Sequence, residues 1–178
     1  PQLSGFYTTP KKISASEFLS QQYMKGYYFP FSMEANYNDV MYIMSKPATM
    51  CHELAHLRGF IREDEANYIS YLACMASDNP EIQYSGLMEA LILSGNALYG
   101  KNADSFFELR AGYDDGVIRD LAANSAYWAQ FHNTKVSNAT EKLNDTYLKA
   151  NDQEDGVQSY GRMVDLLLAE YRKNHGID

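Results

Sequence analysis

The sequence has few cysteines, no excess of positive charge and no long apolar run. Cys51 and Cys74 are its only cysteines, and two at this spacing make neither a disulfide framework nor a cysteine-based zinc site. Lys and Arg number 15 against 23 Asp and Glu, a formal net charge of -8, which argues against nucleic acid as a partner because phosphate binding requires a basic face. No run approaches the roughly 18 apolar residues of a membrane helix, so this chain is expected to be soluble.

The composition is that of a globular domain. Hydrophobic residues make up 46% and charged residues 21% of 178 residues, which fits one domain with a core of its own. We divide this single domain, residues 1–178, into a lead-in with a short helix and an edge strand (1–46), a pair of helices (47–77) and a helical remainder (78–178).

Glycine, proline and apolar spacing predict a mainly helical α+β fold with a small sheet. Ser14 or Ser16 caps a first helix that ends near Lys25. Residues 27–31 are aromatic, contain a proline and suit an extended edge segment, and residues 36–44 predict a short strand. Further helices are predicted at residues 47–58, 62–77, 80–99, 103–110, 114–132, 137–151 and 158–173.

One sequence motif indicates a chemical function. His52, Glu53 and His56 form an H-E-x-x-H sequence in the helix that Pro47 begins and Gly59 ends. Residues i and i+4 share one helix face, so both imidazoles can ligate one zinc ion. Zinc lowers the pKa of a bound water from about 15.7 to near 7, and the neighbouring carboxylate can then take its proton. The motif therefore predicts hydrolysis of peptide bonds, with Glu53 as the general base.

The third ligand is expected on the next helix. Glu63 and Glu65 are about 200° apart on a helix, so only one of them can face the metal. Glu63 shares its face with small residues, which allow two helices to approach closely, whereas Glu65 lies on a bulky stripe. The pattern favours Glu63 and leaves Glu65 as the alternative. Asn67, one turn after Glu63, is placed to hydrogen-bond a histidine ligand, and Arg62 stands where a third histidine ligand would be required.

Several blocks of the chain resemble the bacterial "domain of unknown function 3810" family. The blocks are CHELAHLRGF at residues 51–60, EDEANY at 63–68, GYYFPFSMEAN at 26–36, NDTYLKAN at 144–151 and GVQSYGRMVD at 156–165. Two positions depart from the family pattern, since Met33 stands where glycine is expected and Leu57 where glutamine is expected. Neither departure removes a proposed ligand.

The resemblance implies a zincin-like fold and a glutamate-zincin site with one zinc ion held by His52, His56 and Glu63. It also implies a membrane-anchored protein on the extracytoplasmic face of the bacterial membrane. The anchors would lie in segments that this chain does not include, and the substrate would be a peptide or protein. The oligomeric state and the substrate are left open.

The resemblance also suggests the residues beside the metal. Tyr147, Tyr160 and Arg162 lie in its C-terminal blocks and are candidates to stabilise an oxyanion. Glu34 and Asn36 either line the cleft or shape the strand along which a peptide aligns. Two other functions stay open, a non-catalytic binding or signalling domain on the same scaffold and an all-helical interaction domain in which the histidines only pack.

Overall fold

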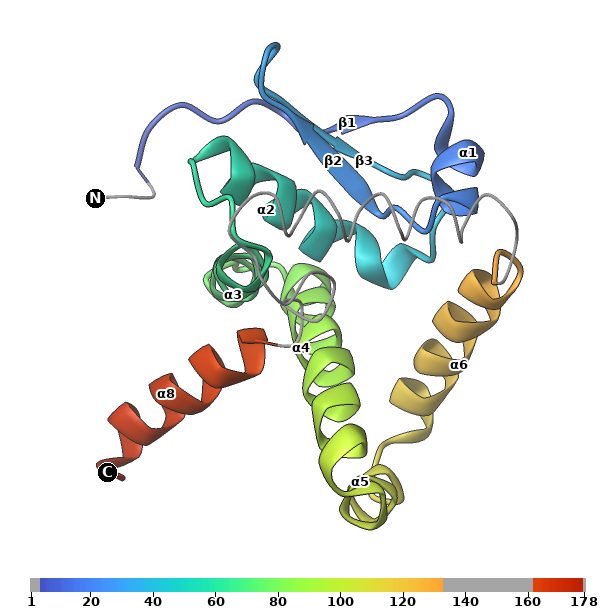
Figure 1. Cartoon of the computed structure of the whole chain (residues 1–178), viewed down its shortest axis with the longest axis vertical. Coiled ribbons are helices and arrows are strands. Elements are labelled where there is room, and N and C mark those ends of the chain that lie inside the picture. Colours follow the sequence, from blue (N-terminus) through green and yellow to red (C-terminus); the bar gives the residue numbers. More distant parts are fainter. Residues whose placement is uncertain (1–3, 133–161, 178) are drawn as a thin grey trace.

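The computed structural model describes residues 4–132 and 162–177, and Figure 1 shows their arrangement. The fold is α+β and mainly helical with a small sheet, as predicted. The elements in chain order are β1 Lys11–Lys12, α1 Ser16–Gln21, β2 Gly26–Phe29, β3 Glu34–Tyr37, the 3-10 helix η1 Ile43–Ser45, α2 Lys46–Leu57, α3 Glu63–Met75, α4 Pro80–Lys101, α5 Ala103–Arg110, α6 Asp115–Ala129 and α8 Met163–His175.

The sheet has three strands in the order β1-β3-β2. β2 and β3 form an antiparallel hairpin in which Tyr27 lies opposite Asn36, and β1 runs parallel to β3 with Lys11 opposite Asn36. The hairpin loop closes with Met33 at φ 57°. The predicted edge strand is therefore confirmed as β2, at one side of the sheet.

The predicted strand at residues 36–44 is wrong beyond Tyr37, where β3 ends. The Asn38 side chain stops the strand, because its Oδ1 accepts from the Val40 amide at 3.1 Å and forms a local turn. Its Nδ2 donates to Ser20 Oγ at 2.8 Å, which fixes the buried turn against α1. The chain then enters η1 rather than continuing in the sheet.

Helix α2 lies between the sheet and helices α3 and α4 (Figure 1). It begins around Pro47, whose fixed φ suits a first turn, and it ends at Leu57 before Gly59, which has a φ of 90°. The turn at Gly59 reverses the chain into α3. Ala55 of α2 and Ala66 of α3 are buried, 2% and 0% exposed, and these small side chains let α2 and α3 pack closely.

The boundary between α4 and α5 differs from the predicted one. The helix predicted at residues 80–99 continues in the structure to Lys101, as α4, and Asn102 then ends it. The Asn102 side chain accepts from the Ser105 amide at 3.0 Å and begins α5. α5 has the predicted bounds, while α3 and α6 are each shorter by a few residues. The predicted helix at 137–151 lies outside the described residues, as does the start of the one at 158–173.

No helix in residues 4–132 or 162–177 combines the length and the apolar character needed to cross a bilayer. This finding agrees with the absence of a long apolar run in the sequence.

Buried hydroxyl groups fix the start of α2. Ser85 Oγ on α4 accepts from the Ala48 amide at 3.0 Å and donates to the Met44 carbonyl, and Ser70 Oγ on α3 donates to the Ala48 carbonyl at 2.6 Å. Ser85 and Ser70 are 2% and 3% exposed. Two helices are thus hydrogen-bonded to the first turn of the motif helix.

We expect Ser85→Ala to lower the free energy of unfolding by about 1–3 kcal/mol, because it leaves a buried donor and a buried acceptor without partners. Urea denaturation followed by circular dichroism measures this change. Ser94→Ala on the same helix is the matched control, since the structure gives Ser94 no side-chain hydrogen bond among the described residues. Equal destabilisation by the two variants would contradict the assignment.

Candidate metal centre

The H-E-x-x-H motif lies on α2 and the candidate third ligand opens α3. His52 Nε2 is 3.2 Å from Glu63 Oε2, and His56 Nε2 is 3.6 Å from Glu63 Oε1. The two imidazole rings lie at 90° with their centroids 4.6 Å apart. All three side chains are largely buried, with exposed fractions of 14–15%. Both histidines therefore direct one nitrogen at the same carboxylate, whereas histidines that only pack would be expected to point apart.

The structure distinguishes the two glutamates that the sequence left open. Glu63 faces the imidazoles, whereas Glu65 is 45% exposed and lies 4.0 Å from Arg62 Nε. Asp64 between them is buried, binds the Arg62 guanidinium at 2.9 Å and accepts from the Glu65 amide. This acid fixes the first turn of α3, so Glu63 is oriented by its place in the helix.

A main-chain hydrogen bond orients the His56 imidazole on the side away from Glu63. His56 Nδ1 lies 2.7 Å from the Phe60 carbonyl in the turn after α2. The carbonyl can only accept, so Nδ1 carries the proton and Nε2 is left with its lone pair toward Glu63. The Asn67 side chain is buried, and its interaction with His52 helps to raise the pKa of that imidazole. Such partners fix ring orientation in metal sites.

Glu53 is buried against the sheet, 4% exposed. A Cβ placed on Gly26 of β2 would lie 2.7 Å from Glu53 Oε1 and 2.6 Å from the Asn36 carbonyl, so only glycine leaves room for this carboxyl group. Glu53 Oε2 is buried and has no hydrogen-bond partner among the described residues. A buried polar oxygen without a partner is costly and marks a place where a water or ligand is expected.

The charges in the cluster shift its pKa values in opposite directions. Burial lowers the pKa of His52, but the Glu63 hydrogen bond, the charges of Glu53 and Glu63 and the Asn67 hydrogen bond outweigh it and raise the pKa to about 8. Burial also raises the pKa of Glu53 to about 8, against the positive charge of His52. Burial and the charge on His52 lower the pKa of His56.

The Glu63 carboxyl group is the main acceptor of the cluster. Burial raises its pKa, but the His52 hydrogen bond and the charges of His52 and His56 outweigh burial and hold the pKa of Glu63 below its ordinary value. The metal-free cluster at neutral pH thus contains an ionised Glu63 beside a protonated His52, with Glu53 protonated behind them.

The structure leaves the candidate oxyanion residues untested and gives Glu34 and Asn36 roles in the hairpin. Tyr147 and Tyr160 lie outside the described residues, and Arg162 is exposed at the residue before α8. Glu34 binds Lys11 and accepts from Ser32 at 2.9 Å, so it stabilises the hairpin. Asn36 lies in β3, where its backbone carbonyl borders Gly26.

Sequence reasoning missed two contributors, Gly26 and the Phe60 carbonyl. Gly26 stood in the sequence only as the first residue of the family-like block at 26–36, with no role in the site predicted for it, and a main-chain acceptor has no sequence signal. Both contacts depend on how the chain folds back on α2.

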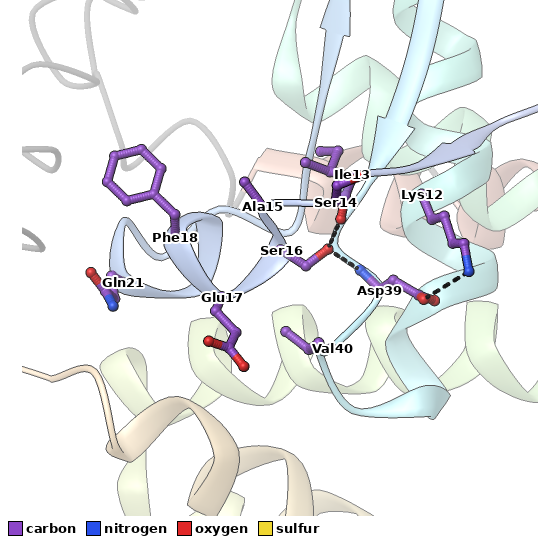
Figure 2. Close-up of a pocket in the computed structure, with 10 residues that line it drawn as sticks. All are labelled: Lys12, Ile13, Ser14, Ala15, Ser16, Glu17, Phe18, Gln21, Asp39 and Val40. Carbon is purple, nitrogen blue, oxygen red and sulfur yellow. Dashed lines mark hydrogen bonds and ion pairs between the residues drawn. The ribbon is translucent and has the colours of Figure 1, made fainter.

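A second hollow lies at the start of α1 and shares no residue with the cluster (Figure 2). Ser16 Oγ there accepts from the Asp39 amide at 2.8 Å and donates to the Ile13 carbonyl, and Lys12 lies 3.9 Å from an Asp39 oxygen. These contacts join α1 to the end of β3, and we interpret them as structural.

The fold and this cluster define an α+β domain in which two histidines and a glutamate converge from consecutive helices. Residues 1–168 match the family described as "Protein of unknown function (DUF3810)", so the chain belongs to that family and the predicted family is confirmed. No curated protein and no solved structure matches the chain.

We expect His52 and Glu53 to make the metal-free protein less stable as the pH rises, Glu53 from about pH 4.5 and His52 from about pH 6.5, until both have lost their protons above pH 8. The folded-state pKa values of His52 and Glu53 are both raised to about 8, so the folded state holds protons that the unfolded chain has released. The stability they contribute is complete below the unfolded pKa values and is lost through pH 8, by up to about 1.4 kcal/mol per pH unit for each proton.

Glu53→Gln removes one of these protons and should flatten the profile. Urea denaturation in chelator at pH 6, 7, 8 and 9 provides the measurement. Glu65→Gln, which changes an exposed acid in the same region, should follow the wild type. Parallel profiles for the wild type and Glu53→Gln would show that Glu53 is not protonated in the folded state.

Proposed function

We propose that this protein is a zinc-dependent metallopeptidase of the zincin-like class. His52, His56 and Glu63 would hold one zinc ion, and Glu53 would act as the general base. The observation that carries the proposal is that one carboxylate meets both imidazole nitrogens while the buried Glu53 Oε2 has no partner among the described residues.

The donor atoms fit zinc in kind and in spacing. Donor atoms about 2.0–2.1 Å from a tetrahedral zinc ion lie about 3.3 Å from one another. The nitrogen–oxygen distances of 3.2 and 3.6 Å are close to this value, and the three donor atoms lie within 4.8 Å of one another. Two imidazoles and one carboxylate leave a fourth position open, as in catalytic zinc sites.

Zinc and the chain's own residues would have separate roles in the hydrolysis. Zinc, when bound, supplies Lewis-acid activation of a water molecule and of the substrate carbonyl. Glu53 Oε2 takes the proton from the attacking water and later donates it to the leaving amine. The charge of a nearby divalent cation favours the ionised form of Glu53, which the metal-free pocket disfavours. Tyr147, Tyr160 and Arg162 remain candidates for stabilising the oxyanion.

The open edge of β2 supports a peptide substrate. The Asn38 amide donates to the Lys25 carbonyl at 2.8 Å, so Lys25 and Asn38 form a hydrogen-bonded pair. Hydrogen-bonded and non-hydrogen-bonded pairs alternate along an antiparallel ladder, and the backbone groups of Gly26 and Tyr28 therefore point away from β3. No strand among the described residues pairs with that edge. An extended peptide could add there by main-chain hydrogen bonds, beside the glycine that touches Glu53. The extracytoplasmic, membrane-anchored placement implied by the family resemblance is part of the same proposal.

We expect one zinc ion per chain in freshly purified protein, measured by elemental analysis. His56→Ala and Glu63→Gln should each lower the zinc affinity by at least about a hundredfold, because each removes one of three protein ligands. Glu65→Gln is the matched control and should keep the wild-type zinc content. Equal loss from Glu63→Gln and Glu65→Gln, or none from either, would contradict the ligand set.

We expect Glu53→Gln to keep the zinc and lose peptide cleavage by at least about a hundredfold, since it removes the proton acceptor but no ligand. Release of fluorescence from a library of quenched peptides measures cleavage, and elemental analysis measures the zinc. A wild type that holds zinc but cleaves nothing, with Glu53→Gln behaving identically, would favour the non-catalytic binding or signalling domain.

A further inference from the structure

The loop of the β2–β3 hairpin and the exposed face of β2 carry exposed apolar side chains. Phe31 is 92% exposed, and Tyr27, Phe29 and Met33 are 37%, 46% and 47% exposed. The Phe29 and Phe31 rings lie 5.6 Å apart. The loop projects beyond the helices in Figure 1. We call these four side chains the aromatic tip.

The N-terminal stretch adds to the same surface. Thr8 Oγ1 donates to the Met33 carbonyl at 3.2 Å, which places this stretch against the hairpin loop, and nearby Phe6 is 76% exposed. Contiguous apolar surface of this kind usually marks an interaction site.

The charge of this region differs from that of the rest of the chain. Residues 4–12 and 26–37 contain Lys11, Lys12 and Glu34 as their only charged side chains, which gives a net charge of +1 within a chain of net charge -8. Glu34 is paired with Lys11, so no uncompensated acid of these two stretches adjoins the aromatic tip. Lys12 lies 3.9 Å from an Asp39 oxygen, so the aromatic tip is an apolar surface without excess negative charge in an acidic chain. Exposed aromatic rings of this kind are typical of segments that enter the interface of a bilayer.

We propose that the aromatic tip inserts into the interfacial region of a phospholipid bilayer. The rings would lie at the level of the headgroups, and Lys11, which lies opposite Asn36 in the sheet, would be the lysine nearest the lipid phosphates. A peptide occupant is less consistent with the burial pattern, because Tyr27 and Phe29 alternate with residues on the face toward Glu53. This proposal does not depend on the metallopeptidase proposal.

The insertion would hold the metal centre close to the bilayer. Gly26, which touches Glu53, and Phe29 are three residues apart on one strand, or about 10 Å at the rise of an extended chain. Substrate segments close to the membrane surface would then lie within reach of the site.

Vesicle flotation tests the proposal on the full chain. The wild type should float with vesicles of phosphatidylcholine and phosphatidylglycerol at a ratio of 7:3 and float less with phosphatidylcholine alone. The double variant Phe29→Ser, Phe31→Ser should lower the partition coefficient by at least about tenfold, because two apolar side chains are lost from the contact. The control Phe107→Ser, Leu109→Ser removes side chains of similar exposure, 58% and 59%, on α5 at the opposite end of the molecule (Figure 1) and should float like the wild type.

A fluorescent reporter distinguishes insertion from loose adsorption. The chain has one tryptophan, Trp128, so Phe31→Trp adds a second signal that brominated lipid should quench, whereas Phe107→Trp should give no added quenching. A wild type that does not float, a serine variant that floats equally well, or an unquenched tryptophan at position 31 would overturn the proposal. A serine variant that raises KM for a cleaved peptide, with no flotation of the wild type, would assign the aromatic tip to peptide binding instead.

Discussion

The close packing of α2 on α3 is the constraint on which the site depends. Two imidazoles on one helix can be placed by helical spacing alone, but the carboxylate must arrive from a second helix within about a hydrogen-bond length. The turn at Gly59 and the alanine side chains at 55 and 66 permit that approach. A bulkier residue at either alanine would separate the helix axes and carry Glu63 away from both nitrogens. The turn also supplies the Phe60 carbonyl that orients His56, so one loop sets both the distance and the direction of the side chains in the cluster.

The small sheet has a chemical consequence as well as a structural one. Glu53 would be an ordinary exposed acid if α2 stood alone, because its side chain projects about 100° around the helix from that of His52. The sheet covers it, and burial is the largest influence on its raised pKa. A carboxyl group whose protonation changes near neutral pH suits a group that first accepts and then donates a proton. Gly26 makes this possible because a side chain there would occupy the position of Glu53 Oε1.

Local signals predicted much of the fold, and long-range contacts account for what they missed. Pro47 and Pro80 begin helices where the sequence indicated, and the contrast between small and bulky faces correctly placed Glu63 rather than Glu65 toward the histidines. The prediction of a strand over residues 36–44 was wrong beyond Tyr37, because the Asn38 side chain forms hydrogen bonds with Ser20 and with the Val40 amide. The pocket around Glu53 could not be predicted, because no periodicity in either segment shows that β2 will cross the motif helix.

The alternation of side chains along β2 lets one strand take part in two separate interactions. Gly26 lies on the face toward Glu53, while Tyr27 and Phe29 lie on the exposed face. Changes on the exposed face leave the packing around Glu53 intact, since neighbouring residues of a strand project to opposite sides of the sheet. The same rigid strand nevertheless fixes the distance between the two faces. A protein held at a surface by the aromatic tip would thus keep the cluster of His52, His56 and Glu63 at a fixed distance from that surface.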